Sequence, residues 1–106
     1  DVSAALMLRR YMQSGRLVLE IRDELCPWND GRFELEGSPE GATYRASNSS
    51  PDLAIGVSDL ASAFMGVVSF STLAQAGLVV EHTPGALLRA DCMFAVQYQP
   101  WTPSHF

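Results

Sequence analysis

The sequence predicts an α+β fold in which helices cover a mostly antiparallel, five-stranded sheet. Between residues 16 and 57, apolar and polar residues alternate in short runs separated by turn sequences, as expected for strands joined in hairpins. After residue 57, apolar residues recur at helical spacing, and Ser, Thr and Gly mark helix ends. The length of 106 residues suits one hydrophobic core, so we expect residues 1–106 to form a single domain.

The chain is expected to begin with a helix from Ser3, its N-cap, to about Gln13, ended by Gly15. The predicted inner face of this helix comprises Ala4, Ala5, Leu8, Tyr11 and Met12. Leu6 and Met7 lie off that stripe. A helix that is apolar on several sides usually has neighbours on several sides.

Four strands are predicted next, at residues 16–23, 32–36, 42–46 and 52–57. Turn-rich sequences at Cys26–Gly31 and Ser38–Gly41 should join the first three strands as antiparallel neighbours. Opposite charges on their outer faces suit this pairing. The fourth strand alternates large apolar residues with Ala54 and Gly56, so we expect it to be covered on both faces.

The rest of the chain alternates helices with one strand. Ser58 is predicted to cap a helix that ends at Gly66, and Ser71 to cap a second helix that ends at Gly77. A strand at residues 78–81, a helix at residues 85–94 begun by Thr83-Pro84, and a C-terminal tail at residues 95–106 complete the prediction.

Composition excludes several functions. The net charge is −5 and no basic stripe exists, so nucleic acid is not expected as a partner. All seven basic residues are Arg, which excludes a Schiff-base or P-loop lysine from this chain. No apolar run reaches the roughly 18 residues of a membrane span. Because the chain begins at Asp1 with helical sequence, we interpret it as a fragment of a longer protein.

The cysteine and histidine residues do not predict a metal site. Cys26, Cys92 and His82 lack any recognised ligand spacing. Two cysteines are too few for a disulfide framework, which favours a reducing, cytoplasmic compartment. Cys92 is interpreted as a buried small hydrophobe and His82 as a structural residue at a strand end.

Three carboxylates, those of Asp23, Glu24 and Asp30, crowd one end of a predicted loop. Paired carboxylates can hydrolyse glycosides, but we favour a solvated acidic turn. Four aromatic residues match strand or helix core positions and are expected to pack in the core: Phe33, Phe64, Phe70 and Phe94.

The C-terminal tail combines stiffness with apolar surface. Pro100 and Pro103 hold the backbone extended, while Trp101 and Phe106 offer rings that can dock into a pocket. Two interpretations stay open: the tail packs on its own domain, or it docks elsewhere and places the α-carboxylate of Phe106 at a specific site. His105 is interpreted as a solvent-facing residue that titrates near neutrality.

An ordered set of motifs carries a family resemblance. The first group is Pro51–Val57, Leu60, Phe64, Gly66, Phe70–Leu73, Ala76-Gly77 and Glu81. It resembles the sterol-carrier-protein fold, in which a strand and two helices frame an apolar cavity. The second group is Cys26–Asn29, Gly31–Phe33, Thr83–Leu87, Ala90-Asp91 and the ending Pro100–Phe106. It is similar to the C-terminal domain of the enhanced-intracellular-survival (Eis) N-acetyltransferases.

This resemblance implies a role within a larger enzyme. Two GNAT-type regions would precede this domain, the first of which binds the cosubstrate acetyl-CoA, and the chains would assemble as hexamers of paired trimers. Such enzymes acetylate amines of aminoglycosides and of some lysine side chains. The C-terminal carboxylate acts as general base, a role that falls here on Phe106. The family's tyrosine acid belongs to the upstream part, so Tyr11, Tyr44 and Tyr98 are not given that role.

The isolated fragment is therefore not expected to be active, and no cofactor or metal ligand is expected within it. An alternative function stays open, that of a sterol or lipid carrier. Its apolar cavity would be lined by Ile55, Leu60, Phe64, Leu73 and Val79. A third role, in oligomerisation, is compatible with the first.

Overall fold

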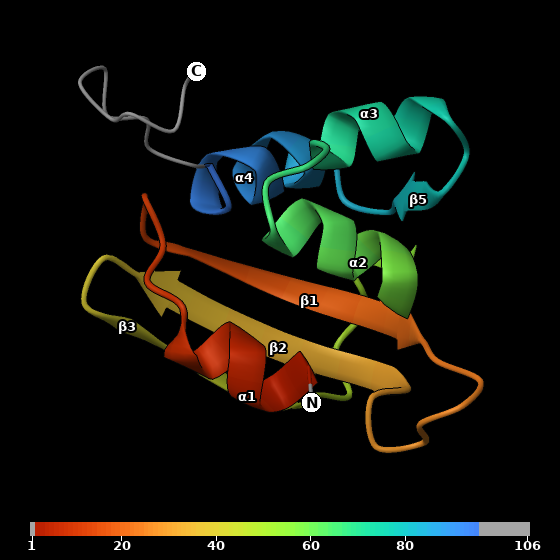
Figure 1. The fold of residues 1–106 in the computed structure, drawn as a ribbon, viewed down its shortest axis with the longest axis horizontal. Coiled ribbons are helices and arrows are strands. Elements are labelled where there is room, and N and C mark those ends of the chain that lie inside the picture. Colours follow the sequence, from red (N-terminus) through yellow and green to blue (C-terminus); the bar gives the residue numbers. More distant parts are fainter. Residues whose placement is uncertain (1, 96–106) are drawn as a thin grey trace, which may run out of the picture.

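The structure, a computed structural model, describes residues 2–95 (Figure 1). Its elements in order are α1 (Val2–Leu8), β1 (Gly15–Arg22), β2 (Gly31–Ser38), β3 (Gly41–Ala46), β4 (Leu53–Gly56), α2 (Val57–Phe64), α3 (Phe70–Gln75), β5 (Val79–Glu81) and α4 (Ala86–Met93). The predicted order of helices and strands is confirmed. The tail residues 96–106, with Trp101, His105 and Phe106, lie outside the described residues.

The sheet has the strand order β3-β2-β1-β4-β5. The strands β3, β2 and β1 pair antiparallel, as do β4 and β5, while β1 and β4 run parallel. The predicted, mostly antiparallel five-stranded sheet is thus confirmed. The chain must cross from β3 to the far side of β1 to form the parallel pair, and the loop before Leu53 makes this crossing.

The domain has two layers, with the helices against one face of the sheet (Figure 1). Strand alternation explains this, because Leu17, Leu19 and Ile21 all point to the helical side and are buried. The opposite face carries ion pairs between neighbouring strands, including Arg32 with Glu20, whose Nε and Oε2 atoms lie 3.2 Å apart. Such exposed pairs select register more than they add stability.

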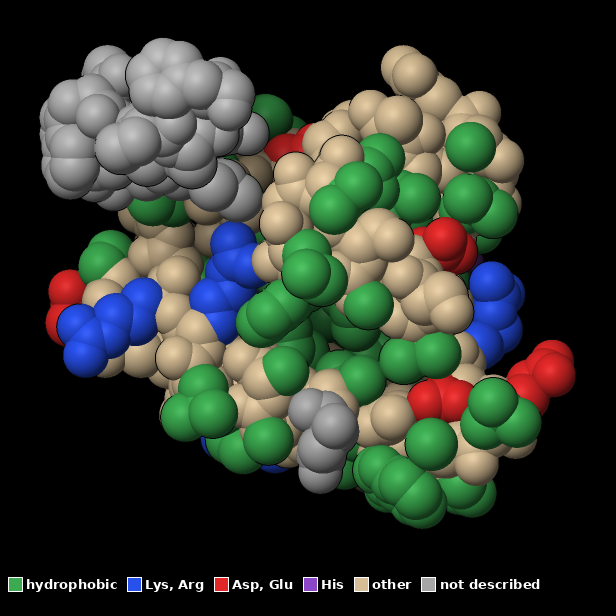
Figure 2. Space-filling view, viewed as in Figure 1, with side chains coloured by type: hydrophobic (Ala, Val, Ile, Leu, Met, Phe, Trp, Pro, Cys, Tyr) green, Lys and Arg blue, Asp and Glu red, His purple; other side chains and the backbone are tan. Residues whose placement is uncertain are grey.

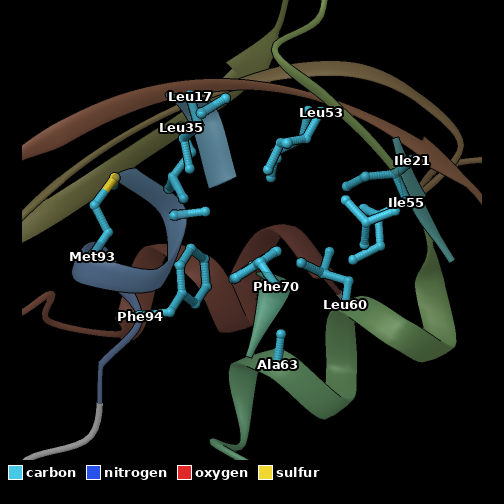
Figure 3. Close-up of a cluster of buried hydrophobic side chains, with 14 of the residues drawn as sticks. Leu17, Ile21, Leu35, Leu53, Ile55, Leu60, Ala63, Phe70, Met93 and Phe94 are labelled. Carbon is cyan, nitrogen blue, oxygen red and sulfur yellow. The ribbon is translucent and has the colours of Figure 1, made fainter. Parts of the chain in front are cut away.

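The core lies between the sheet and the helices. Figure 3 shows side chains of β1, β2 and β4 meeting Leu60 of α2, Phe70 of α3 and the end of α4. Phe70 and Phe94 contact each other edge to face, with ring centroids 5.0 Å apart. Both rings are buried, as predicted, whereas Phe33 and Phe64 are half-buried and pack against the rim of the core.

The first helix is shorter than predicted, and its buried face differs. It ends at Leu8 because the following residues bond to other parts of the fold: Tyr11 N–H donates to Ser38 O at 3.0 Å and Met12 N–H to Met93 O at 3.2 Å. Leu6, placed off the predicted stripe, is 1% exposed, whereas Leu8, placed on it, is 85% exposed. The prediction of the inner face was therefore wrong for both leucines.

The helix caps also differ from the prediction. Ser3 lies inside α1, and the N-cap of α4 is Gly85 and not Thr83. The N-cap of α2 is Gly56, so Ser58 lies inside the first turn. The N-cap of α3 is Ser69, whose side chain accepts the N–H of Thr72 at 3.0 Å. Ser69 and Ser71 lie two residues apart at this turn, and the prediction chose the wrong one of the two. Ser71 instead bonds to Asp91.

Candidate functional site

The predicted catalytic residue, Phe106, lies beyond the described part of the chain, as do Tyr98 and His105. The structure therefore describes the part of the fold that immediately precedes the tail. This part is the C-terminal end of α4, where Phe94 is the C-cap and Ala95 is the last described residue.

Arg9 holds this helix end in place. Its guanidinium donates to the carbonyl oxygen of Phe94 at 2.8 Å and to that of Phe64 at the end of α2. The same group lies over the rings of Phe64, Phe94 and Tyr11, 5.0, 5.2 and 5.7 Å from their centroids. An arginine suits this position because its planar, weakly hydrated fork can donate and stack at once. Three segments distant in sequence are thereby joined.

A second anchor lies one turn earlier on α4. The carboxylate of Asp91 accepts the N–H of Phe70 at 2.7 Å, the N–H of Ser71 at 3.3 Å and the Ser71 hydroxyl at 2.5 Å. It therefore satisfies backbone donors at the start of α3, which a helix cannot satisfy itself. A hollow of about 230 Å³ adjoins this contact and is bordered by Gly66, Asp91 and Ala95 among others.

A larger apolar groove, of about 360 Å³, lies between α1 and α2. Every residue that lines it is apolar: Val2, Ala5, Leu6, Val57, Leu60, Ala61, Phe64 and Met65. Leu6 and Leu60 are buried at its floor, and Met65 is exposed at its rim. Neither Arg9 nor this groove was identified from the sequence. The one available signal was that the first helix is apolar on several sides.

The interior proposed for a lipid cavity is mostly packed. Ile55, Leu73 and Val79 are buried within the hydrophobic core, beside Phe70 and Phe94. The two remaining predicted lining residues, Leu60 and Phe64, border the groove between α1 and α2 instead. The structure thus does not bring the five residues together around one cavity.

The described tyrosines are structural. Tyr11 is buried and its hydroxyl donates to Leu6 O at 2.8 Å. Tyr44 stacks on Phe33 with ring centroids 5.0 Å apart. Burial raises the pKa of both phenols above their ordinary value, so they stay protonated at neutral pH.

The cysteines and His82 are not brought together. Cys26 lies in the loop after β1, Cys92 in α4 and His82 after β5. Among residues 2–95, no group of three or more His, Cys, Asp or Glu side chains is arranged to hold a metal ion. Cys92 is half-buried, so the prediction that it is a buried small hydrophobe was wrong.

The acidic loop owes its order to Asp23. Its carboxylate accepts the Asn29 amide at 2.9 Å and the backbone N–H groups of Cys26 and Leu25, each at 3.0 Å. These donors, the Asn29 amide first, lower the pKa of Asp23 below its ordinary value. Asp30 in turn accepts the N–H of Asp23 at 2.8 Å. The two carboxylates organise a turn.

Comparison with known proteins places this geometry in a family. Residues 2–103 match the model of the sterol carrier protein domain. The whole chain is 44% identical to an uncharacterized N-acetyltransferase of Streptomyces avermitilis and 41% identical to one of Streptomyces coelicolor. Each match covers 100% of this chain but 26% of the relative, so the chain spans about a quarter of the length of these curated relatives.

Solved structures agree. The crystal structure of Eis1 from Mycobacterium abscessus is 35% identical, with a TM-score of 0.81, over 96% of this chain and 25% of that one. A GCN5-related N-acetyltransferase from Anabaena variabilis is 27% identical, with a TM-score of 0.83, over 92% of this chain and 25% of that one. The resemblance predicted from the sequence is confirmed. This chain belongs to the sterol carrier protein domain family, in the form found within N-acetyltransferases of the Eis type.

Proposed function

We propose that this domain is the C-terminal part of an acetyl-CoA-dependent N-acetyltransferase that acts on amines of aminoglycosides or lysine side chains. The observation that carries the proposal is the match along the whole chain to N-acetyltransferases about four times its length. The acetyl-CoA site and the amine site would lie in the preceding part of the polypeptide.

The chemistry proposed for this domain is that of a base. An amine arrives mostly as an ammonium ion and must lose a proton before it attacks a thioester. The α-carboxylate of Phe106 has an ordinary pKa of about 3.3–3.7, so it is ionised at neutral pH. Burial in a pocket would raise that pKa toward a value useful for proton transfer. The negative charge would also help to bind a polycationic substrate.

The described residues support this role by fixing the start of the tail. Arg9 ties Phe94 to α2, and Asp91 ties α4 to α3. A firmly held attachment point for the tail reduces the conformational freedom that must be lost when the reactive group is positioned. The stiff sequence from Pro100 to Pro103 acts in the same direction.

The proposal includes a homo-oligomer, as hexamers of paired trimers, and a cytoplasmic location. Two free cysteines support a reducing compartment. No helix within residues 2–95 is long and apolar enough to cross a membrane.

A second candidate function is that of a lipid carrier, favoured by the apolar groove between α1 and α2. Its volume of about 360 Å³ lies at the small end of the range for ligand sites. The packed interior around Phe70 and Phe94 argues against a larger cavity deeper in the fold. The acetyltransferase role therefore has the stronger support.

The proposal is tested on the full-length parent protein, by acetyl transfer from acetyl-CoA to an aminoglycoside and to a lysine peptide. Deleting Phe106, or adding one glycine after it, should abolish turnover while acetyl-CoA binding persists. Phe106→Leu is the matched control, because it keeps a terminal carboxylate at the same position and should retain most of the rate. Equal turnover with the added glycine would rule out the carboxylate of Phe106 as the base.

A further inference from the structure

The apolar face around the start of α1 is larger than the groove alone. Figure 2 shows hydrophobic side chains gathered over α1 and α2. Met65, at the rim of the groove, is 74% exposed. Exposed apolar area of this kind, continuous with a groove, marks a binding surface more often than scattered single residues do.

The loop between β1 and β2 lies next to this face. Leu25 is 90% exposed and Trp28 is 66% exposed, although the loop itself is ordered by the carboxylate of Asp23. Asn29 from the same loop accepts the N–H of Val2 at 3.3 Å, and Val2 also lines the groove. Loop and groove therefore meet at the first turn of α1. An exposed Trp on a hydrogen-bonded loop is the kind of residue that anchors protein interfaces.

We propose that the groove between α1 and α2, together with Leu25 and Trp28, is the docking surface for the acetyltransferase part of the same polypeptide. This inference rests on the proposed function, since it assumes that an acetyltransferase part precedes Asp1 in the polypeptide. It names the surface of this domain that would receive that part.

Three observations favour this occupant. The relatives are about four times as long as this chain, so a large partner is tethered to it. Val2, the first residue of α1, lines the groove, so a part of the polypeptide joined ahead of α1 would be tethered next to this face. Tethering raises the effective concentration of a partner to the millimolar range for short linkers. The wholly apolar lining requires apolar side chains from that partner.

The test is hydroxyl-radical footprinting of the full-length protein, with each labelling rate normalised to that of the unfolded chain. Met65 and Trp28 should label several-fold more slowly than their exposure in the isolated fold predicts. Leu88 on α4, which is 68% exposed, serves as the solvent-facing reference. Labelling of Met65 and Trp28 at the rates set by their exposure here would overturn the proposal.

A charge in the groove provides the second arm. Ala61 lines the groove and is exposed, so Ala61→Glu should restore labelling of Met65 in the full-length protein. Gln75→Glu adds the same charge at an exposed position of α3 and should leave Met65 protected. If Ala61→Glu fails to fold, the labelling of the unmodified protein still decides the matter.

Two further outcomes would overturn the docking proposal. Protection of Met65 that disappears when the protein is diluted would assign the face to a second copy. Protection that disappears after lipid extraction, with lipid found by native mass spectrometry, would assign it to a carried lipid. Acetyl transfer is measured in parallel. Protection of Met65 without any amine acetylation would support the docking surface and refute the proposed function. Amine acetylation without protection of Met65 would support the proposed function and refute the docking surface.

Discussion

The guanidinium of Arg9 donates a hydrogen bond to the carbonyl oxygen of Phe94 at 2.8 Å across a separation of 85 positions in the chain. This contact joins the segment after α1 to the end of α4, where the C-terminal tail begins. The ring of Phe94 lies beneath the same guanidinium, with 5.2 Å between Cζ and the ring centroid. One side chain thus joins the segment after α1 to the helix end that precedes the proposed catalytic tail.

Arg9→Met should lower the free energy of unfolding by about 2–4 kcal/mol, because it leaves the carbonyl groups of Phe64 and Phe94 without their charged donor. Arg9→Lys should recover only part of this, since an ammonium lacks the planar fork that reaches both carbonyls. Urea denaturation measures the change. Arg10→Met, at the exposed neighbouring position, is the matched control and should change stability little. Equal effects at both positions would contradict the anchoring role.

Leu6→Ala should destabilise the protein by about 2–5 kcal/mol, because the Leu6 side chain is buried on the inner face of α1 and its truncation would leave a cavity. Leu8→Ala is the matched control on the same helix and should stay within about 0.5 kcal/mol of the unmodified protein. Thermal unfolding of both variants checks this. A larger loss for Leu8 than for Leu6 would restore the inner face predicted from the sequence.

Gly37→Ala should cost about 1–3 kcal/mol, because an added Cβ would lie 2.5 Å from a ring carbon of Tyr11. The ring cannot move away freely, since the Tyr11 hydroxyl and N–H bond to Leu6 and Ser38. Gly15→Ala meets the flexible side chain of Met93 at the same distance and should cost less. A double-mutant cycle of Gly37→Ala with Tyr11→Leu should show strong coupling in unfolding free energy, and additive effects would refute the contact.

Asp23→Asn should reduce stability at neutral pH, and the difference from the unmodified protein should shrink in acid. The pKa of Asp23 is lowered in the folded state, so its carboxylate contributes stability above the unfolded value of about 3.9. That contribution is lost as the pH falls through the folded pKa. Denaturation between pH 7 and pH 2 measures it. Glu24→Gln, exposed in the same loop, is the control, and a difference that persisted unchanged in acid would contradict the prediction.

Much of the fold was predictable because its signals are local. The alternation around Leu19, the turn chemistry at Cys26–Gly31 and the small residues beside Ile55 each specify an element within a few residues. The mostly antiparallel sheet follows from short turns between consecutive strands. The parallel pairing of β1 with β4 is different, since it depends on a crossing that no local pattern encodes.

The candidate site was predictable only in part. The family resemblance led to Phe106 and to the tail, both outside the described residues. The two anchors at the start of that tail were not identified as anchors. Asp91 belongs to one of the motifs that carry the resemblance, but its bonds to the start of α3 could not be read from that motif. Arg9 belongs to no motif, because an arginine bonded to distant backbone carbonyls leaves no local pattern. Their partners are distant in the chain and become neighbours only after folding.

By itself, the sequence determined the class of fold, the order of its elements and the family, since these depend on periodicity, turn residues and ordered motifs along the chain. The tertiary structure decided where α1 ends, that Leu6 and not Leu8 is buried, and that Arg9 meets Phe94. The physical reason is that helix propensity near residue 9 is weaker than the bonds that Arg9, Tyr11 and Met12 make to other parts of the fold. Long-range contacts of this kind form only when the whole core assembles.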